Sequence, residues 1–402
     1  MSNADLVAKA DNPVLAPPGL EGVAVAETTI GDVRGEEGFF HYRGYNATVL
    51  ARECSFEQVW HLLIEGELPD PEQTKRFRAD TVRLRTLPEQ VSRLLPEIAR
   101  IDPFVPLDAL RTAVSLVASA IGLQPTMDIS AEEVRQQAVR MTALVPVLLT
   151  GLYRAHQGLE PVAADPDLDY AASYLQMLTG ERPDEVHARA VEKYLILTMD
   201  HGFNASTFTA RVIASTGADM GSALVGAIGA LSGPLHGGAP SRALHTLDEI
   251  GTEDRAYDYL KEKVISGERL MGFGHRVYKT DDPRSTLLRE VALQLGGEQA
   301  QFAEHVEQTA LKVLNELKPG RRLYTNVEFY AGVVMNTAGI PRDMFTPTFA
   351  SSRTVGWTAA ICEQASHNRL IRPSAVYVGP RHRGPSRSGI TTSERSPAPQ
   401  GR

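Results

Sequence analysis

The sequence predicts a mainly α-helical protein of two domains with a short β-hairpin near its N-terminus. Through most of the chain, apolar residues recur at intervals of three and four, which places them on one helix face. The alternation typical of strands is convincing in a single stretch near the N-terminus. With 402 residues, and roughly 150 residues per domain, the chain has material for more than one domain and a large core.

Composition and charge exclude several classes of protein. Hydrophobic residues make up 43% and charged residues 22% of the chain, as in an ordinary soluble globular protein. The formal net charge of −8 argues against a nucleic-acid binder and against adsorption to an anionic membrane. Cys54 and Cys362 are too few for a disulfide framework, and their separation fits no zinc site. Without an export signal or a membrane-spanning stretch, we expect a cytoplasmic protein.

The N-terminal elements come first along the chain. Residues 1–18 are rich in Ala, Asp, Asn and Pro without a sustained period, so we expect a flexible arm. From Gly19, the segment GLEGVAVAETTIGDV, in which Val23 and Val25 and then Thr and Ile alternate, predicts a first strand. The segment FFHYRGY, which follows the turn residues Gly35 to Gly38, predicts its partner. Together they predict the hairpin.

Helical patterns begin after Ser55. The clearest apolar stripe consists of Val134, Ala138, Met141, Val145, Leu148 and Leu152. Similar periods predict helices in DEVHARAVEKYLILTMDHG, EHVEQTALKVLNELKPG and RTVGWTAAICEQASHN. Residues 381–402, rich in Pro, Ser, Thr and Arg, predict a disordered basic tail, which is a solvated extension rather than a nucleic-acid arm.

Three histidines occur in unusual local sequence. His236 lies within LSGPLHGGAP, where Gly and Pro prevent a regular helix and let the backbone approach a ligand. His275 lies within MGFGHRVYKTDDPRS, beside cations that suit phosphates and carboxylates. His201 precedes Asn204 and Ser206, either of which is able to cap the next helix. One such histidine is more often structural than catalytic, but the three with their glycines indicate a functional site.

Other kinds of site have weaker support. GFGHRV is superficially like a dinucleotide loop, but no apolar strand precedes it and the third glycine is missing. A metal site of His201, His236, His275 and a carboxylate stays open as a minor hypothesis, although no short ligand spacing such as HExxH occurs. Neither a GxSxG elbow nor a Walker loop is present, so hydrolase and P-loop chemistry have no support.

Four segments, in this order, resemble the citrate synthase family, including the 2-methylcitrate synthases and the short bacterial type called citrate synthase 2. They are GPLHGGAP, MGFGHRVYKTDDPRS, NVEFYAGVVMNTAGIPRDMFTPTFASSRTVGW and RLIRPSAVYVGP. The resemblance covers residues 19–379. It implies a large helical domain formed by residues 19–237 and 340–380, and a small domain formed by residues 238–339, with the active site between them.

The resemblance implies a role for each matching residue. His236 is expected to bind the thioester carbonyl of acetyl-CoA, His275 to polarise the ketone of oxaloacetate, and Glu328 to remove the methyl proton. The dicarboxylate is expected to be bound by His201, Arg284, Arg353 and Arg372. Coenzyme A is expected to be bound by Gly272, Phe273, Gly274 and Lys279. The resemblance implies neither a metal nor a resident cofactor, because acetyl-CoA is a substrate.

The chemistry of the reaction supports this assignment of roles to the residues. The methyl group of a thioester is a weak carbon acid, so the base works only if a fixed donor meets the enolate oxygen. A histidine at a glycine-rich helix start is expected to stay neutral because of the helix dipole, and it still donates one hydrogen bond. Planar guanidinium groups bind carboxylates bidentately, which explains the arginines in an acidic protein.

The resemblance also has consequences for assembly and for rate. Arg372 is expected to reach the active site of the neighbouring subunit, which implies an obligate homodimer. The short N-terminal arm favours a dimer over the hexamer of allosteric relatives. Glu328 stands where the family usually has Asp, and a shift of about 1 Å in a carboxylate can cost on the order of 10²-fold in rate. Two alternatives to a citrate synthase stay open. One is a 2-methylcitrate synthase that uses propionyl-CoA, and the other is a weak paralogue with a binding or regulatory role.

Overall fold

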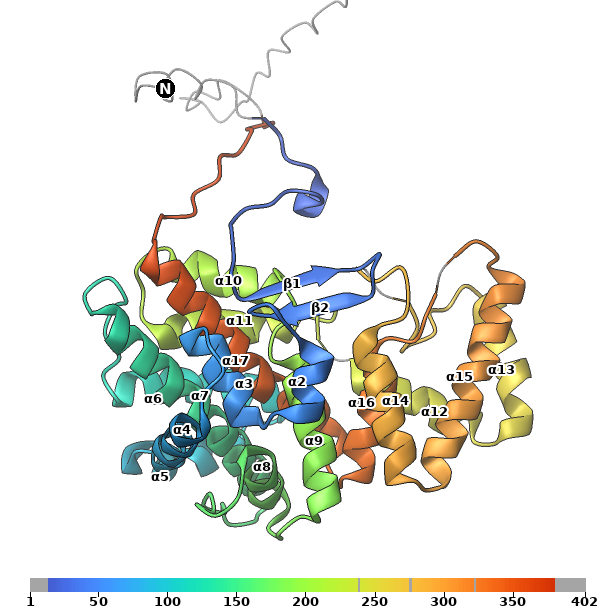
Figure 1. Cartoon of the computed structure of the whole chain (residues 1–402), viewed down its shortest axis with the longest axis horizontal. Helices are drawn as coiled ribbons and strands as arrows, with labels where there is room; N and C mark the ends of the chain where they lie inside the picture. Colours follow the sequence, from blue (N-terminus) through green and yellow to red (C-terminus); the bar gives the residue numbers. More distant parts are fainter. Residues whose placement is uncertain (1–13, 238, 275–276, 322, 380–402) are drawn as a thin grey trace, which may run out of the picture. The chain divides into compact units, whose positions relative to one another are not determined.

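The computed structural model describes residues 14–237, 239–274, 277–321 and 323–379, and it is mainly α-helical, as the sequence predicts (Figure 1). Residue contacts divide the chain into two units. One consists of Met1–Glu27 and Arg372–Arg402, and its described part contains the 3-10 helix η1, Pro18–Leu20. The other, Thr28–Ile371, contains the remaining helices and strands of the described residues. Most of the predicted arm and all of the predicted tail lie outside the described residues, and the boundary between a large and a small domain stays a prediction.

A three-stranded antiparallel sheet precedes the helices of the second unit. Its strands are β1 (Gly31–Arg34), β2 (Phe39–Tyr42) and β3 (Tyr45–Asn46), in that order. Gly31 pairs with Tyr42, so β1 and β2 form the predicted hairpin around the turn at residues 35–38. This part of the prediction is confirmed.

The predicted first strand is wrong at its N-terminal end. Val23 and Val25 alternate with small residues, but they lie outside β1 and both are exposed. β2 ends at Tyr42 because the chain turns through Arg43 and Gly44, both at positive φ, into β3. β2 therefore has no further residues with which the segment around Val23 and Val25 could pair. Alternating side chains form a β-strand only where a neighbouring strand is present.

The helices occupy the rest of the unit. The first are α2 (Ala47–Glu53), α3 (Phe56–Glu65), α4 (Pro71–Arg83), α5 (Glu89–Ala99) and α6 (Pro106–Ala120). They are followed by α7 (Ala131–His156), α8 (Tyr170–Thr179), α9 (Glu185–Thr198), α10 (Ala205–Ala214) and α11 (Met220–Leu231). The last are α12 (Ala239–Ile250), α13 (Glu253–Ile265), α14 (Pro283–Leu295), α15 (Glu298–Leu317), α16 (Val327–Thr337), the 3-10 helix η2 (Arg342–Met344) and α17 (Phe345–Ser366).

The helical predictions are confirmed where the sequence gives a clear period. The apolar stripe from Val134 to Leu152 lies in α7, and all of its members are buried. The three other segments coincide with α9, α15 and α17. In each case the apolar side chains pack against neighbouring helices, which is the main source of helix stability in a protein.

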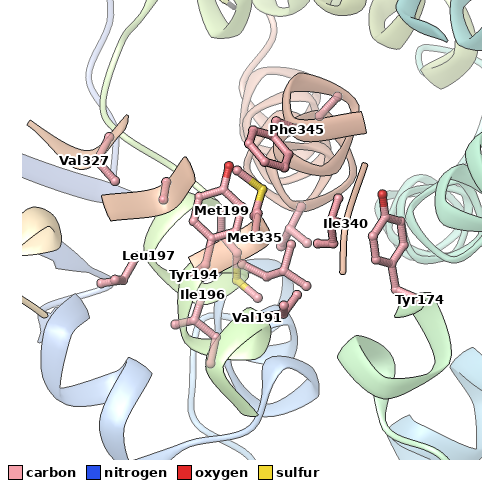
Figure 2. Packing of buried hydrophobic residues seen from close by; sticks show 14 of the residues in the cluster. Tyr174, Val191, Tyr194, Ile196, Leu197, Met199, Val327, Met335, Ile340 and Phe345 are labelled. Atoms are coloured by element: carbon pink, nitrogen blue, oxygen red, sulfur yellow. The ribbon is translucent and has the colours of Figure 1, made fainter. Parts of the chain in front are cut away.

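The helix α17 is central to the core of the second unit. It contacts α3, α7, α9, α10 and α11 and is buried around its whole circumference, as expected for a helix surrounded by others (Figure 1). A Cβ atom at Gly356 would lie 2.3 Å from the carbonyl oxygen of Met199, so α17 and the end of α9 touch through their backbones. Figure 2 shows part of this core, with Tyr194 of α9, Met335 of α16 and Phe345 of α17 in one cluster.

The turn of the hairpin is docked on the segment that precedes α14. The carbonyl oxygen of Gly35 accepts a hydrogen bond from the backbone N–H of Lys279 at 3.1 Å. A Cβ atom at Gly35 would lie 2.0 Å from the carbonyl oxygen of Val277, a distance that no side chain tolerates. The hairpin therefore restrains the segment on which Tyr278 lies.

The variant Gly35→Ala should lower the free energy of unfolding by about 1–3 kcal/mol, because the added methyl group overpacks this contact. Gly229→Ala on α11 is the matched control, since a Cβ atom there would lie 3.9 Å from its nearest neighbour, the Cδ atom of Arg111, and alanine is favoured over glycine inside a helix by about 0.5–1 kcal/mol. Denaturant unfolding of both variants measures the difference. Equal stability of the two would contradict the docking of the turn.

Candidate active site

His201 lies directly after α9, at the start of the loop to α10. Its Nε2 atom is 3.1 Å from the phenol oxygen of Tyr278, and its ring centre is 5.6 Å from that of Phe40 on β2. Asn204 accepts a hydrogen bond from the N–H of Thr207 and caps α10, which is one of the two caps that the sequence predicts. His201 is thus placed between the hairpin and the segment that contains Tyr278.

His236 lies in the turn between α11 and α12, where its glycine-rich sequence predicts a break between helices. Its Nε2 atom is 2.8 Å from the hydroxyl oxygen of Ser206, and the backbone N–H of Ser206 donates to the same nitrogen at 3.3 Å. Ser206, the alternative cap, therefore contacts this histidine instead. The Ser206 hydroxyl oxygen also accepts a hydrogen bond from the indole N–H of Trp357 at 3.0 Å, which anchors it to α17.

The charge state of His236 follows from its surroundings. Burial and, as a second cause, the positive charge of Arg353 together lower the pKa of His236 to about 4. The imidazole is therefore neutral near pH 7, as expected from the sequence. The dominant cause differs from the expected one, because burial and a cation, not the dipole of a helix, exclude the second proton.

The two predicted arginines within this unit are buried. Arg284 lies in the first turn of α14, and its Nε and Nη2 atoms donate to the two carboxylate oxygens of Asp282 at 3.0 and 2.8 Å. Arg353 lies on α17, where its Nε atom donates to the carbonyl oxygen of Thr198 at 2.8 Å. Its guanidinium carbon is 4.5 Å from the ring centre of Phe349, a cation–π geometry.

Buried carboxylates accompany these cations. Asp282 accepts hydrogen bonds from the backbone N–H of Arg284 and from that of Val327, at 3.0 and 3.1 Å, besides the guanidinium of Arg284. Asp200, at the end of α9, is also buried. Burial raises the pKa of Asp200 and the charge of Arg353 opposes the rise, so the two groups lie close together. Each arginine thus has an acidic neighbour that lowers the cost of its burial.

Glu328 and His236 line the same pocket. Glu328 lies in the first turn of α16, and its backbone N–H donates to the side chain of Asn326 at 3.1 Å, which caps the helix. The pocket contains about 360 Å³ of empty space, part of it open to solvent. Its lining residues are Tyr194, Thr198, His236, Gly237, Val327, Glu328, Ala331, Thr346 and Phe349. A carboxylate and a neutral imidazole therefore face a mostly apolar space.

The surroundings of Tyr194 show that the charged groups gather around this pocket. Burial raises the pKa of Tyr194, the charge of Glu328 raises it further, and Arg353 and Arg284 oppose the rise. The same two arginines oppose the rise that burial causes in the pKa of Tyr42 on β2. Glu328, Arg284 and Arg353 therefore all act electrostatically on Tyr194, although they come from three different helices.

The predicted coenzyme A segment is packed against the start of α16. Gly272 and Gly274 have positive φ, and a Cβ atom at Gly272 would lie 2.9 Å from the ring of Phe329. Phe273 forms a β-bridge with Thr325. The close packing therefore explains the presence of these glycines without a ligand, because no larger residue would allow it. Lys279 is exposed, and its backbone N–H is bonded to the hairpin turn.

Two predicted residues are not brought to this site by the described structure. His275 lies outside the described residues. Arg372 is exposed and belongs to the unit formed by Met1–Glu27 and Arg372–Arg402, so its role stays a prediction. Of the supporting residues that the sequence analysis missed, Asp282 alone has a clear local signal, because an aspartate before a proline is typical of a helix start.

The alternative of a metal site has no geometric support among the described side chains, where no three His, Cys, Asp or Glu residues are grouped as ligands. His275, one member of that alternative, lies outside them. In the described ranges, none of the helices combines the length and the apolar character needed to cross a membrane.

Comparisons with known proteins agree on one family. The family described as "Citrate synthase, C-terminal domain" matches residues 19–374. The citrate synthase of Deinococcus radiodurans is 39% identical over 369 residues, which are 90% of this chain and 96% of that protein. Citrate synthase 2 of Bacillus subtilis is 37% identical over 365 residues, with 91% of this chain and 96% of that protein covered.

Solved structures extend the similarity to the fold. The crystal structure of citrate synthase from Thermotoga maritima has a TM-score of 0.79 and 36% identity, and the match covers 90% of this chain and 96% of that one. The structure of the enzyme from Thermoplasma acidophilum, a ternary complex with carboxymethyl coenzyme A and oxaloacetate, has a TM-score of 0.83 and 30% identity. That match covers 91% of this chain and 97% of the archaeal one.

We expect His236 to stay neutral from pH 8 down to about pH 5, because its lowered pKa of about 4 delays protonation. NMR of ring-labelled histidine, with the His236→Asn variant to assign the signal, measures this titration. Since the unfolded chain takes up the proton at higher pH than the folded one, this group makes the free energy of unfolding fall as the pH drops from 6.5 towards 4. A His236 signal that titrates near pH 6.5 would contradict the burial of the ring.

Proposed function

The chain belongs to the citrate synthase family and is an enzyme of the acyltransferase class, and from this premise we propose that it condenses acetyl-CoA with oxaloacetate and water to give citrate and CoA. One observation carries the proposal. His236, Glu328 and Tyr194 line one pocket, and the buried guanidinium groups of Arg284 and Arg353 act electrostatically on Tyr194 there. A base, a neutral donor and a binding site for a dianion are the groups that this reaction requires.

Oxaloacetate is proposed to bind through its two carboxylates to Arg284 and Arg353, with His201 beside them. Guanidinium groups bind carboxylates in a planar, bidentate way, and in a buried site such pairs are strong. Arg284 directs two of its three nitrogens to Asp282, so that carboxylate orients the guanidinium plane before the substrate arrives. Arg372 of the partner subunit is proposed to complete the site, which makes the active form a homodimer.

Enolisation of acetyl-CoA is proposed to be shared by Glu328 and His236. Glu328 takes a proton from the methyl group, and His236 donates a hydrogen bond to the thioester oxygen on which negative charge develops. Because the backbone N–H of Ser206 donates to Nε2, we assign the single proton of the neutral imidazole to Nδ1, from where it can be donated. The mostly apolar walls of the pocket strengthen this hydrogen bond because they exclude water.

Condensation and hydrolysis complete the reaction. The nucleophilic methylene carbon forms a bond to the ketone carbon of oxaloacetate, whose oxygen is proposed to be polarised by His275. Water then cleaves the thioester of citryl-CoA and releases the thiol of CoA. Closure of the small domain over the large one would exclude water until the carbon–carbon bond has formed.

Coenzyme A itself is proposed to lie along residues 272–274 and near Lys279. The exposed ammonium group of Lys279 suits a phosphate, while the backbone of the two glycines permits a close approach. Acetyl-CoA is a substrate, and the proposed proton transfers involve side chains only, so we propose no resident cofactor.

The proposed acyl group is acetyl, with propionyl as the alternative. Purified protein with oxaloacetate should release the thiol of CoA from acetyl-CoA, with a kcat/KM about 10- to 200-fold above that for propionyl-CoA, as one methylene in an apolar pocket permits. Thiol detection with each thioester, with and without oxaloacetate, measures this. A preference for propionyl-CoA would identify a 2-methylcitrate synthase. Thiol release from neither by folded protein would leave a binding or regulatory role.

The base is tested by a pair of variants at one position. Glu328→Gln keeps the shape of the side chain but removes the base, so kcat should fall by about 10²- to 10⁴-fold while the KM for oxaloacetate changes little. Glu328→Asp keeps the charge but withdraws it by more than about 1 Å, so kcat should fall by on the order of 10²-fold. A Glu328→Asp variant that is faster than the natural protein would show that the site is shaped for aspartate.

A further inference from the structure

We propose that Glu307, a buried carboxylate on α15, is a positioning residue for the base Glu328. Glu307 takes no part in the reaction described above, and its side chain does not line the pocket. The inference rests on the proposed role of Glu328 and adds how the helix that holds this base is kept in place.

Glu307 binds the chain on both sides of Glu328. One carboxylate oxygen accepts a hydrogen bond from the hydroxyl of Thr325 at 2.6 Å, and the other accepts one from the phenol of Tyr330 at 2.5 Å. Thr325 lies before the first residue of α16, and Tyr330 is its fourth residue. A single carboxylate of α15 therefore connects two points that flank the base.

The contact with Tyr330 lies on the side of α16 that is directed away from the base. Side chains two residues apart on a helix point to opposite sides, so Tyr330 is directed away from Glu328. Val327, Glu328 and Ala331, which are neighbours on one helix face, line the pocket. Tyr330 also follows Val327 by three residues, so Glu307 restrains α16 from a flank of the helix that is directed away from Glu328, and from there a tether can limit rotation of the helix about its axis.

The charges around Glu307 make this tether strong. The carboxylate, 8% exposed, and the two hydroxyls are removed from water, and a buried charge requires partners in good geometry. Burial and the neighbouring Glu307 raise the pKa of Tyr330, so the phenol keeps its proton and donates it. The Nε atom of Arg289 on α14 lies 3.3 Å from Glu307 and supplies a positive charge. Hydrogen bonds to a charged group are stronger than those between neutral groups.

Other contacts restrain the same helix start from a different direction. The side chain of Asn326 donates to the carbonyl oxygen of Gly274 at 2.9 Å, and the N–H of Val327 donates to Asp282 at 3.1 Å. These bonds connect α16 to the segments around the predicted substrate residues. Glu307 adds an attachment to α15, so that the helix start is held from two sides.

The test removes one hydrogen bond at a time. Thr325→Val and Tyr330→Phe each delete a hydroxyl with little change of shape, whereas Thr325→Ser keeps it. Tyr257→Phe is the control, because it deletes a tyrosine–carboxylate hydrogen bond of 2.7 Å between α13 and α15 that is exposed. We expect Thr325→Val and Tyr330→Phe to lower kcat about 10-fold, with the KM for oxaloacetate within about twofold. Thr325→Ser and Tyr257→Phe should keep kcat near that of the natural protein.

A second readout separates positioning from a general loss of structure. If the base is displaced, proton removal becomes more rate-limiting, so the kinetic isotope effect with trideuteroacetyl-CoA should rise in Thr325→Val and Tyr330→Phe only. Melting temperatures of all four variants report whether they fold. If the natural protein forms citrate and the two variants match it in kcat and isotope effect, the role of Glu307 is refuted while the proposed function stands. If the natural protein releases no CoA, the proposed function itself fails.

Discussion

The active-site region depends on keeping two guanidinium groups out of water at one place in an acidic protein. Removing one such charge from water costs several kcal/mol, and two like charges near each other cost more. Asp282 and Asp200 offset this cost, one through direct hydrogen bonds to Arg284 and the other through its charge near Arg353. Burial and the positive charge of Arg353 lower the pKa of His236, so the cation proposed to bind the dianion also keeps the proposed donor neutral.

The elements around these charges are positioned by contacts between distant parts of the chain. Gly356 lets α17 touch the end of α9, which places Arg353 against the carbonyl of Thr198. The hairpin contributes Phe40, whose ring lies 5.9 Å from the guanidinium carbon of Arg284. The small sheet of this mainly helical protein thus packs beside the charged groups. The close docking of its turn on the segment before α14 keeps the sheet in that position.

The sequence predicts helices and turns well where the residue pattern that specifies them lies within one segment of the chain. The stripe in α7 and the hairpin turn are local patterns, and both are confirmed. Val23 and Val25 show the limit, because a strand requires a partner and the length of that partner depends on where β2 turns. For the candidate site, the motifs identify the residues proposed to form it, but not Ser206 or Glu307, whose contacts are with side chains far away in the sequence.

A glutamate in the proposed role of base requires precisely positioned surroundings. Glutamate has one more rotatable bond than aspartate, and fixing a side-chain rotation costs on the order of 1 kcal/mol or less. Two features of the structure offset that cost. The start of α16 is capped by Asn326 and attached to α15 through Glu307, so the backbone under Glu328 has a defined place. Tyr194 and Phe349 line the pocket, so bulky walls reduce the orientations open to the carboxylate. The extra methylene is therefore compatible with a precise base, provided that the helix is held firmly and the walls stay in contact.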